Sequence, residues 1–128
     1  MKNLKGSMTV EAAYVVPIVL MVFVMIVYST FYFHDKNIIK GTLCEVEAII
    51  GQRERIEETA DHGSIYFEER LGDKLILLTD YTFESEAVGD EVILYVRASH
   101  GVMSTSAQGI ARATRPEKHI RMMRNVTR

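Results

Sequence analysis

The N-terminal quarter of the chain decides its fold. Residues 2–33 read KNLKGSMTVEAAYVVPIVLMVFVMIVYSTFYF: two lysines and a Gly-Ser pair precede a lone glutamate, Glu11, and then 22 uncharged residues. The uncharged run is long enough to cross a bilayer as a helix. A carboxylate at the start of a membrane span costs free energy and is usually kept for a function. The sequence therefore predicts a membrane helix that begins with a functional acid.

An ordinary secretory signal is the first alternative for this segment. Such a signal needs an apolar region of about 7 to 15 residues and then a small-residue cleavage site. Here the run is longer and ends in Phe31, Tyr32 and Phe33, with no such site after them. We expect the segment to stay as an anchor. Lys2 and Lys5 precede it, which favours a cytoplasmic N-terminus and an extracytoplasmic C-terminal part.

Length and composition limit the part of the chain beyond the anchor. The chain has 128 residues and a formal net charge of −2, a balance that argues against a dedicated nucleic-acid surface. About 95 residues remain after the anchor, enough for one small domain. The single cysteine, Cys44, excludes an intrachain disulfide. It is either a small buried hydrophobe on a helix, which we favour, or a disulfide partner between two subunits.

Helical periodicity continues past the membrane. Apolar side chains recur at Ile39, Leu43, Val46 and Ile50, at the spacing of one helical face. The pattern predicts one helix from about residue 9 to residue 60, ended by the turn-forming residues 61–64. We expect a leader over 1–6, a transmembrane helix over 7–34, a helical stalk over 35–62 and a small strand-rich extracytoplasmic part over 63–128.

The C-terminal part changes to the alternating pattern of strands. Residues 75–83 and 92–98 alternate, and Gly89-Asp90 between them is a candidate hairpin turn. A weaker third strand is expected within 102–114, and residues 115–117 (Arg-Pro-Glu) open a short final helix. The predicted fold class is α+β: a long N-terminal helix, transmembrane in its first half, followed by a small antiparallel β-sheet.

The leader fits the chemistry of a prepilin-type signal. A peptidase at the cytoplasmic membrane face needs an unhindered bond, which Gly6 and the small Ser7 supply, while Lys2 and Lys5 hold the leader at anionic headgroups. Cleavage between Gly6 and Ser7 creates an α-amino group with a reference pKa of about 7.7–8.0. In an assembly, Glu11 of one subunit could pair with that amine on another and fix the register. Alternatively, Glu11 is only an acid favoured at a helix N-terminus.

These residues resemble a known family. The segment KGSMTVEAAYVVPIVLMVF followed by FYFHDK is similar to the TadE-like pseudopilins of tight-adherence (Flp/Tad) pilus systems, in their Firmicutes form. That family shows a G-(S/A)-x-T-V-E-A-A core before an apolar stretch with a proline. The matching positions here are Gly6, Ser7, Thr9, Val10, Glu11, Ala12, Ala13 and Pro17. The resemblance covers roughly residues 5–36, and beyond them only the pilin-like layout agrees.

The resemblance implies a role and a set of partners. It implies a minor pilin or pseudopilin of a type IV pilus or secretion system, cut by an aspartic prepilin peptidase. Its partners would be membrane lipid, the peptidase, other pilin subunits and the Tad assembly platform. The protein would be a single-pass membrane protein that can enter a surface pilus and act in adhesion or secretion. An uncleaved, single-span accessory or binding protein of an envelope complex stays open as the alternative.

Other chemistry finds little support in the sequence. A tethered envelope enzyme would need converging titratable groups, and no nucleophile motif or phosphate-binding loop is present, so we expect no catalysis and no cofactor. The four histidines lack the spacing of a zinc site. Acids crowd the predicted hairpin, where a solvated strand face is favoured over calcium: Asp80, Glu84, Glu86, Asp90 and Glu91. The basic tail, 112–128, is interpreted as a solvated terminus or as a contact for lipid headgroups or an acidic partner.

Overall fold

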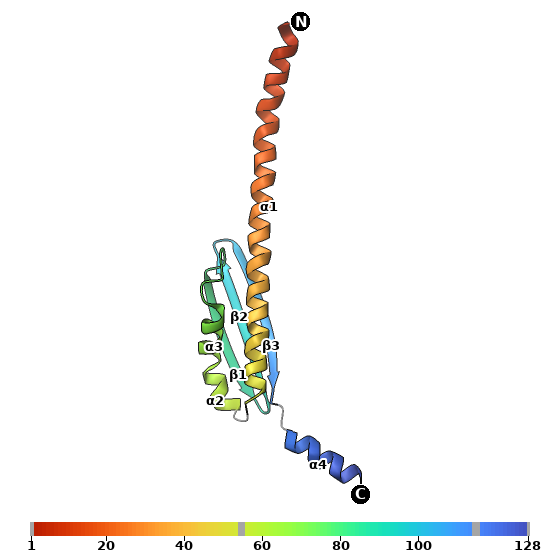
Figure 1. Ribbon diagram of the computed structural model, residues 1–128. Helices are drawn as coiled ribbons and strands as arrows, with labels where there is room; N and C mark the ends of the chain where they lie inside the picture. Colours follow the sequence, from red (N-terminus) through yellow and green to blue (C-terminus); the bar gives the residue numbers. More distant parts are fainter. Residues whose placement is uncertain (1, 54–55, 114–115, 128) are drawn as a thin grey trace. The chain divides into compact units, whose positions relative to one another are not determined.

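The computed structural model describes residues 2–53, 56–113 and 116–127, with side chains over 6–53, 58–113 and 120–127. The chain divides into two compact units, Met1–His34 and Asp35–Arg128. Helix α1, Lys2–Gly51, supplies all the described backbone of the first unit and the first element of the second (Figure 1). The remaining elements all belong to the second unit. A long N-terminal helix followed by a small antiparallel sheet confirms the predicted α+β, pilin-like fold class.

The first part of α1 is apolar on every side. All described side chains from 6 to 31 are exposed, and one helix of the described chain, Gly6–Gly51, is long and apolar enough to span a membrane. Pro17 lies inside it without ending it. Ser29 and Thr30 donate their hydroxyls to the carbonyls of Met25 and Ile26 one turn earlier, at 2.8 and 2.9 Å. Such back-bonding satisfies hydroxyls where no water is at hand.

The second part of α1 buries one stripe. Ile39, Leu43, Val46 and Ile50 are each at most 2% exposed, which confirms the predicted helical face. The predicted continuation of this helix to residue 60 is wrong, because α1 ends at Gly51 and a separate helix, α2, covers Ile56–Asp61. The sequence between Ile50 and Ile56 holds no apolar residue, so a continued helix there would have no side chain to bury.

Three strands form one antiparallel sheet in the order β1-β2-β3. They are β1, Asp80–Val88; β2, Glu91–His100; and β3, Met103–Arg112. The predicted turn at Gly89-Asp90 and the second and third strands are confirmed, with φ of +63° at Gly89. The first strand is misplaced by the sequence pattern. It begins at Asp80, and residues 75–79, four of them apolar, precede it as a loop.

One face of the sheet carries the core. On β2, Val92, Leu94, Val96 and Ala98 are buried, and their partners across the ladders share that face. Helix α3, Gly63–Leu71, packs Phe67 against Phe83 and Tyr81 of β1, with ring centroids 5.1 and 5.7 Å apart. A Cβ on Gly63 would lie 3.3 Å from the Phe83 ring, so glycine permits that approach.

The second half of α1 lies on the same face of the sheet, beside β3 (Figure 1). A Cβ on Gly51 would lie 3.1 Å from the carbonyl oxygen of Arg112, and a Cβ on Gly109 would overlap the Glu47 carboxylate. Both glycines therefore let helix and strand approach closely. The last helix, α4, is Pro116–Val126 and begins at the proline that predicted it; Arg115 lies outside the described residues.

Candidate functional site

The residues of the predicted leader site lie on one helix. Gly6, Ser7 and Glu11 all belong to α1 and are exposed. Ser7 and Glu11 are four residues apart, so they share a helical face about 6 Å apart along the axis. The backbone of Lys2 and Lys5 lies in α1, and their side chains fall outside the described ones. The structure thus places the Gly6–Ser7 bond and the Glu11 carboxyl about one turn apart on one helix.

Gly6 has no packing role within the described part of the chain. A Cβ placed there would meet no atom within 4 Å. By contrast, Gly51, Gly63 and Gly109 each face an atom that a Cβ would crowd. A requirement for glycine at position 6 would therefore have to come from a molecule outside this chain.

The exposed apolar surface after Glu11 is the largest candidate interaction surface. It extends along α1 to Phe33, and a helix that is apolar all round is normally buried in lipid or in a bundle of helices. Ala12 and Ala13 at its start are small enough to let another helix approach closely. Lipid, copies of the same helix, or both in turn can cover this surface.

Asp35 is a buried acid with a structural role that sequence reasoning missed. Its position just after the span suits the outer membrane interface, yet its side chain is fully buried. The carboxylate accepts backbone N–H groups from Ile76, Leu77 and Leu78, with the closest N···O distances 3.0, 2.6 and 2.8 Å. Three such charge-assisted bonds tie the start of the second unit to the loop before β1.

A local signal for Asp35 is present in the sequence. Asp35 precedes Ile39 by four residues and so lies on the buried stripe that continues to Ile50. An acid at a buried stripe position needs donors from elsewhere in the chain. The donors come from more than 40 residues away, and local periodicity does not identify them.

Two further residues of α1, Cys44 and Glu47, have surroundings that were not predicted from the sequence. Cys44 is a free, exposed thiol, so its favoured interpretation as a buried hydrophobe is wrong. Glu47 lies over Gly109 on the covered face of the sheet, and burial raises the pKa of its carboxyl. Burial, and second the nearby Glu68 carboxylate, raise the pKa of Tyr81.

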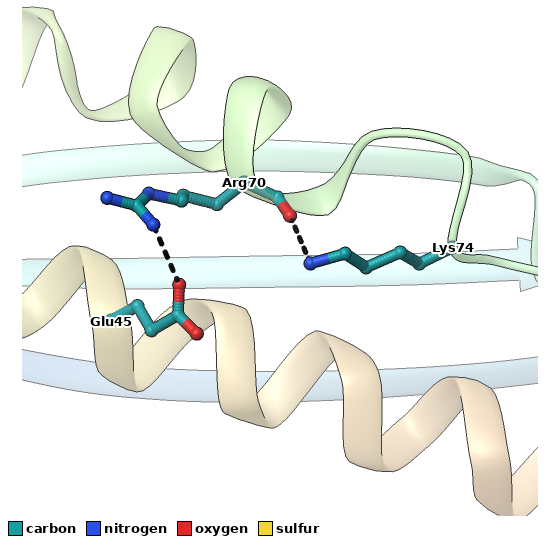
Figure 2. A network of polar contacts seen from close by, with 3 residues as sticks. All are labelled: Glu45, Arg70 and Lys74. Atoms are coloured by element: carbon teal, nitrogen blue, oxygen red, sulfur yellow. Dashed lines mark hydrogen bonds and ion pairs between the residues drawn. The ribbon is translucent and has the colours of Figure 1, made fainter.

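A surface network links α1 to α3. Figure 2 shows the Arg70 guanidinium of α3 directed at Glu45 of α1, with Nη1 3.9 Å from Oε2. Lys74 donates from Nζ to the Arg70 carbonyl at 2.9 Å. Both side chains of the ion pair are 57% exposed, so the pair contributes little to stability.

Metal sites and catalytic groupings find little support in the described part of the chain. Among its residues, no group of three or more His, Cys, Asp or Glu side chains could hold a metal ion. The hairpin acids are dispersed: Glu84 and Glu86 point from the outer face of β1, and Glu91 pairs with Arg112 at 2.6 Å. A shallow hollow between α1 and α3 is lined by Ile49, Gln52, Arg53, Tyr66, Glu69 and Arg70, which include no nucleophile with a neighbouring base.

Comparison with known proteins adds no family to these observations. Protein-family models, curated proteins and solved structures were each searched, and none matches this chain.

Proposed function

We propose that this protein is a minor pilin or pseudopilin subunit of a type IV pilus or secretion system of the Tad/Flp kind. A prepilin peptidase would cut it between Gly6 and Ser7, and the mature subunit would assemble through its N-terminal helix. The observation that carries the proposal is the first part of α1. It is exposed on all sides, apolar throughout and preceded by an acid four residues after a small residue.

The leader geometry supports cleavage. No contact within the described chain explains a glycine at position 6, since a Cβ there would meet no atom. A peptidase active site that must approach this bond closely would explain it. The bond lies in the second turn of α1, close to a helix end, where helices fray. Glycine there weakens the helix by about 1 kcal/mol relative to alanine. Unwinding this end to present the bond therefore costs little free energy.

Glu11 supports assembly rather than folding of the single chain. It is exposed on the span, one turn from the residue whose amine cleavage would release. In a bundle, that amine on a neighbouring copy neutralises the carboxylate. A subunit in the wrong register would leave the charge unpaired in apolar surroundings, which costs several kcal/mol. The membrane itself would hold the subunit before assembly, N-terminus cytoplasmic.

The first test is the mass of the intact protein purified from its native membrane, together with its N-terminal peptide. We expect a mature chain beginning at Ser7, and in Gly6→Val an accumulating precursor. Glu11→Ala should still be cleaved yet incorporate poorly into assemblies. Normal processing of Gly6→Val would remove the cleavage-site assignment, and full incorporation of Glu11→Ala would remove the register argument.

One observation favours the second candidate, an uncleaved membrane-anchored accessory or binding protein. Helix α1 begins at Lys2 and runs through Gly6 and Ser7 without a break. A continuous helix protects its peptide bonds from proteolysis unless that end unwinds. A purified chain that retains Met1 or Lys2 would establish this function class over the pilin proposal, with Glu11 reduced to a helix-start acid.

A further inference from the structure

The chain separates its charge between the folded part of the second unit and the C-terminal segment. Residues 35–113 contain fifteen acidic and eight basic side chains, a net charge of −7. Residues 114–128 contain five basic side chains and one acid, a net charge of +4. Such an asymmetry marks the segment as one that binds an acidic surface.

Helix α4 combines this positive charge with an unburied apolar face. Ile120, Met123 and Val126 recur at helical spacing and are 66%, 69% and 88% exposed. Arg121 lies on the other side of the helix, and Arg124, four residues after Ile120, lies at the edge of the apolar face. Amphipathic helices of this kind bind grooves or surfaces through their apolar face.

The outer face of the sheet offers matching chemistry. Cross-strand pairing places Ile93 between Glu86 and Ile110, and Tyr95 between Glu84 and Gln108. Tyr95 and Ile110 are 41% and 51% exposed, so this face is not covered by the helices that bury the opposite face. No ion pair to Glu84 or Glu86 occurs among the described side chains. We call Glu84, Glu86, Ile93, Tyr95 and Ile110 the outer patch.

We propose that α4 docks on the outer patch of a second copy of this chain. Ile120, Met123 and Val126 cover the patch's apolar residues, while Arg124, at the edge of that face, faces the acids of β1. A contact between two different surfaces of identical subunits is head-to-tail, which generates a ring or a filament. The inference rests on the proposed function, because copies held together by their membrane helices give this small contact its effective concentration.

Two other partners for α4 fit the structure less well. The chain's own outer patch is within reach in sequence, yet both surfaces are exposed in the single chain. A membrane surface could take the apolar face of α4, but it would leave the exposed acids and apolar residues of the outer patch uncovered.

Cysteine cross-linking between differently tagged copies tests the contact directly. Full-length chains, all Cys44→Ser, are reconstituted together in zwitterionic vesicles: one carries Met123→Cys, the other Tyr95→Cys. We expect mixed-tag disulfide dimers on mild oxidation. Asn125→Cys, on the polar side of α4, is the matched control and should give at least about fivefold less, since a disulfide needs Cβ atoms about 4 Å apart. Mixed-tag yields at the control level overturn the proposal.

Charge exchange tests the complementarity. Arg124→Glu should lower the cross-link yield about fivefold, and Glu84→Lys with Glu86→Lys on the partner should restore it. Glu68→Lys with Glu69→Lys, an equal change on exposed α3, is the control and should not restore it. Equal restoration by the control, or none by the patch variant, contradicts docking at the outer patch.

Two further measurements distinguish a failure of the docking proposal from a failure of the proposed assembly through the membrane helices. Val16→Cys in both copies reports association of the membrane helices. Span cross-links without α4 cross-links overturn the docking alone, and the reverse overturns assembly through the span but not the docking. A bimane label at Met123→Cys whose emission shifts to the blue only in vesicles with phosphatidylglycerol, without cross-linking, assigns α4 to lipid and overturns the proposal.

Discussion

The two halves of α1 share one backbone geometry and face opposite surroundings. From residue 6 to 31 every described side chain is exposed, whereas Ile39, Leu43, Val46 and Ile50 are buried by the rest of the second unit. The difference is one of sequence: the first half is apolar all round, and the second is apolar along one stripe. The stripe finds its partner inside the chain. The first half needs lipid or another subunit, and interaction with other molecules is therefore expected there.

Asp35 begins the second half, and its loss should have the largest effect on stability. Asp35→Ala leaves the N–H groups of Ile76, Leu77 and Leu78 without their acceptor in a buried site. Removing one partner of a buried charged network costs about 3–5 kcal/mol. Urea unfolding of the full chain in detergent, followed by near-UV circular dichroism of the Phe67 aromatic cluster, measures the loss.

Two further variants serve as comparisons for Asp35→Ala. Asp35→Asn keeps one acceptor oxygen and should lose less stability than Asp35→Ala. Asp73→Ala removes an exposed acid and should change the free energy of unfolding by less than about 0.5 kcal/mol. Equal stability of Asp35→Ala and the wild type would mean that the loop before β1 holds its position without the carboxylate.

A matched pair of leucines tests the comparison itself. Leu43→Ala deletes a 2% exposed side chain from the buried stripe and should cost about 3 kcal/mol of unfolding free energy in the second unit. Leu20→Ala makes the same change in the first half, where the side chain is 59% exposed in the single chain, and should leave that free energy unchanged. Similar losses for the two variants would show that the halves are energetically coupled, which contradicts their division into two surroundings.

Local pattern explains how much of this fold the sequence could predict. The stripe from Ile39 to Ile50, the hairpin turn at Gly89 and the start of α4 each depend on residues within one element or turn, and each is predicted correctly. Pairing of β2 with both neighbours also results from short connections. These features need no knowledge of distant parts of the chain.

The errors concern long-range contacts. Residues 75–79 are rich in β-forming apolar side chains, but the amides of 76–78 bind Asp35, and the ladder begins only at Asp80. Cys44 is an exception, because it follows Leu43 by one residue and so lies about 100° around the helix from the stripe; its exposure could have been predicted from periodicity. Of the candidate site, the sequence supplied Gly6, Ser7 and Glu11, because that pattern is local. It missed Asp35, whose partners lie more than 40 residues away.

Gly109→Ala tests how closely the second half approaches the sheet. The added methyl group would overlap the Glu47 carboxylate, and that flexible side chain must move away. We expect a loss of about 1 kcal/mol in unfolding free energy, the low end for added volume in a packed site. In Glu47→Ala the same glycine substitution should cost less, and the difference measures the coupling. Additive losses would show that Glu47 does not restrict position 109.

Glu47 also gives the smallest expected effect, a pH dependence confined to the second half. Burial raises the pKa of its carboxyl above 4.5, so the native state holds this proton more tightly than the unfolded state. Stability rises with pH only where the unfolded state binds more protons, so here it falls as the pH increases from 4.5 through the raised pKa. Glu47→Gln should remove this fall, seen as the difference between wild-type and variant urea midpoints across that range. Glu45→Gln, on the exposed side of the same helix, controls for the loss of one charge. A difference curve with the opposite slope would mean that the native site favours the carboxylate, and that Glu47 has a cationic or hydrogen-bonding partner in solution.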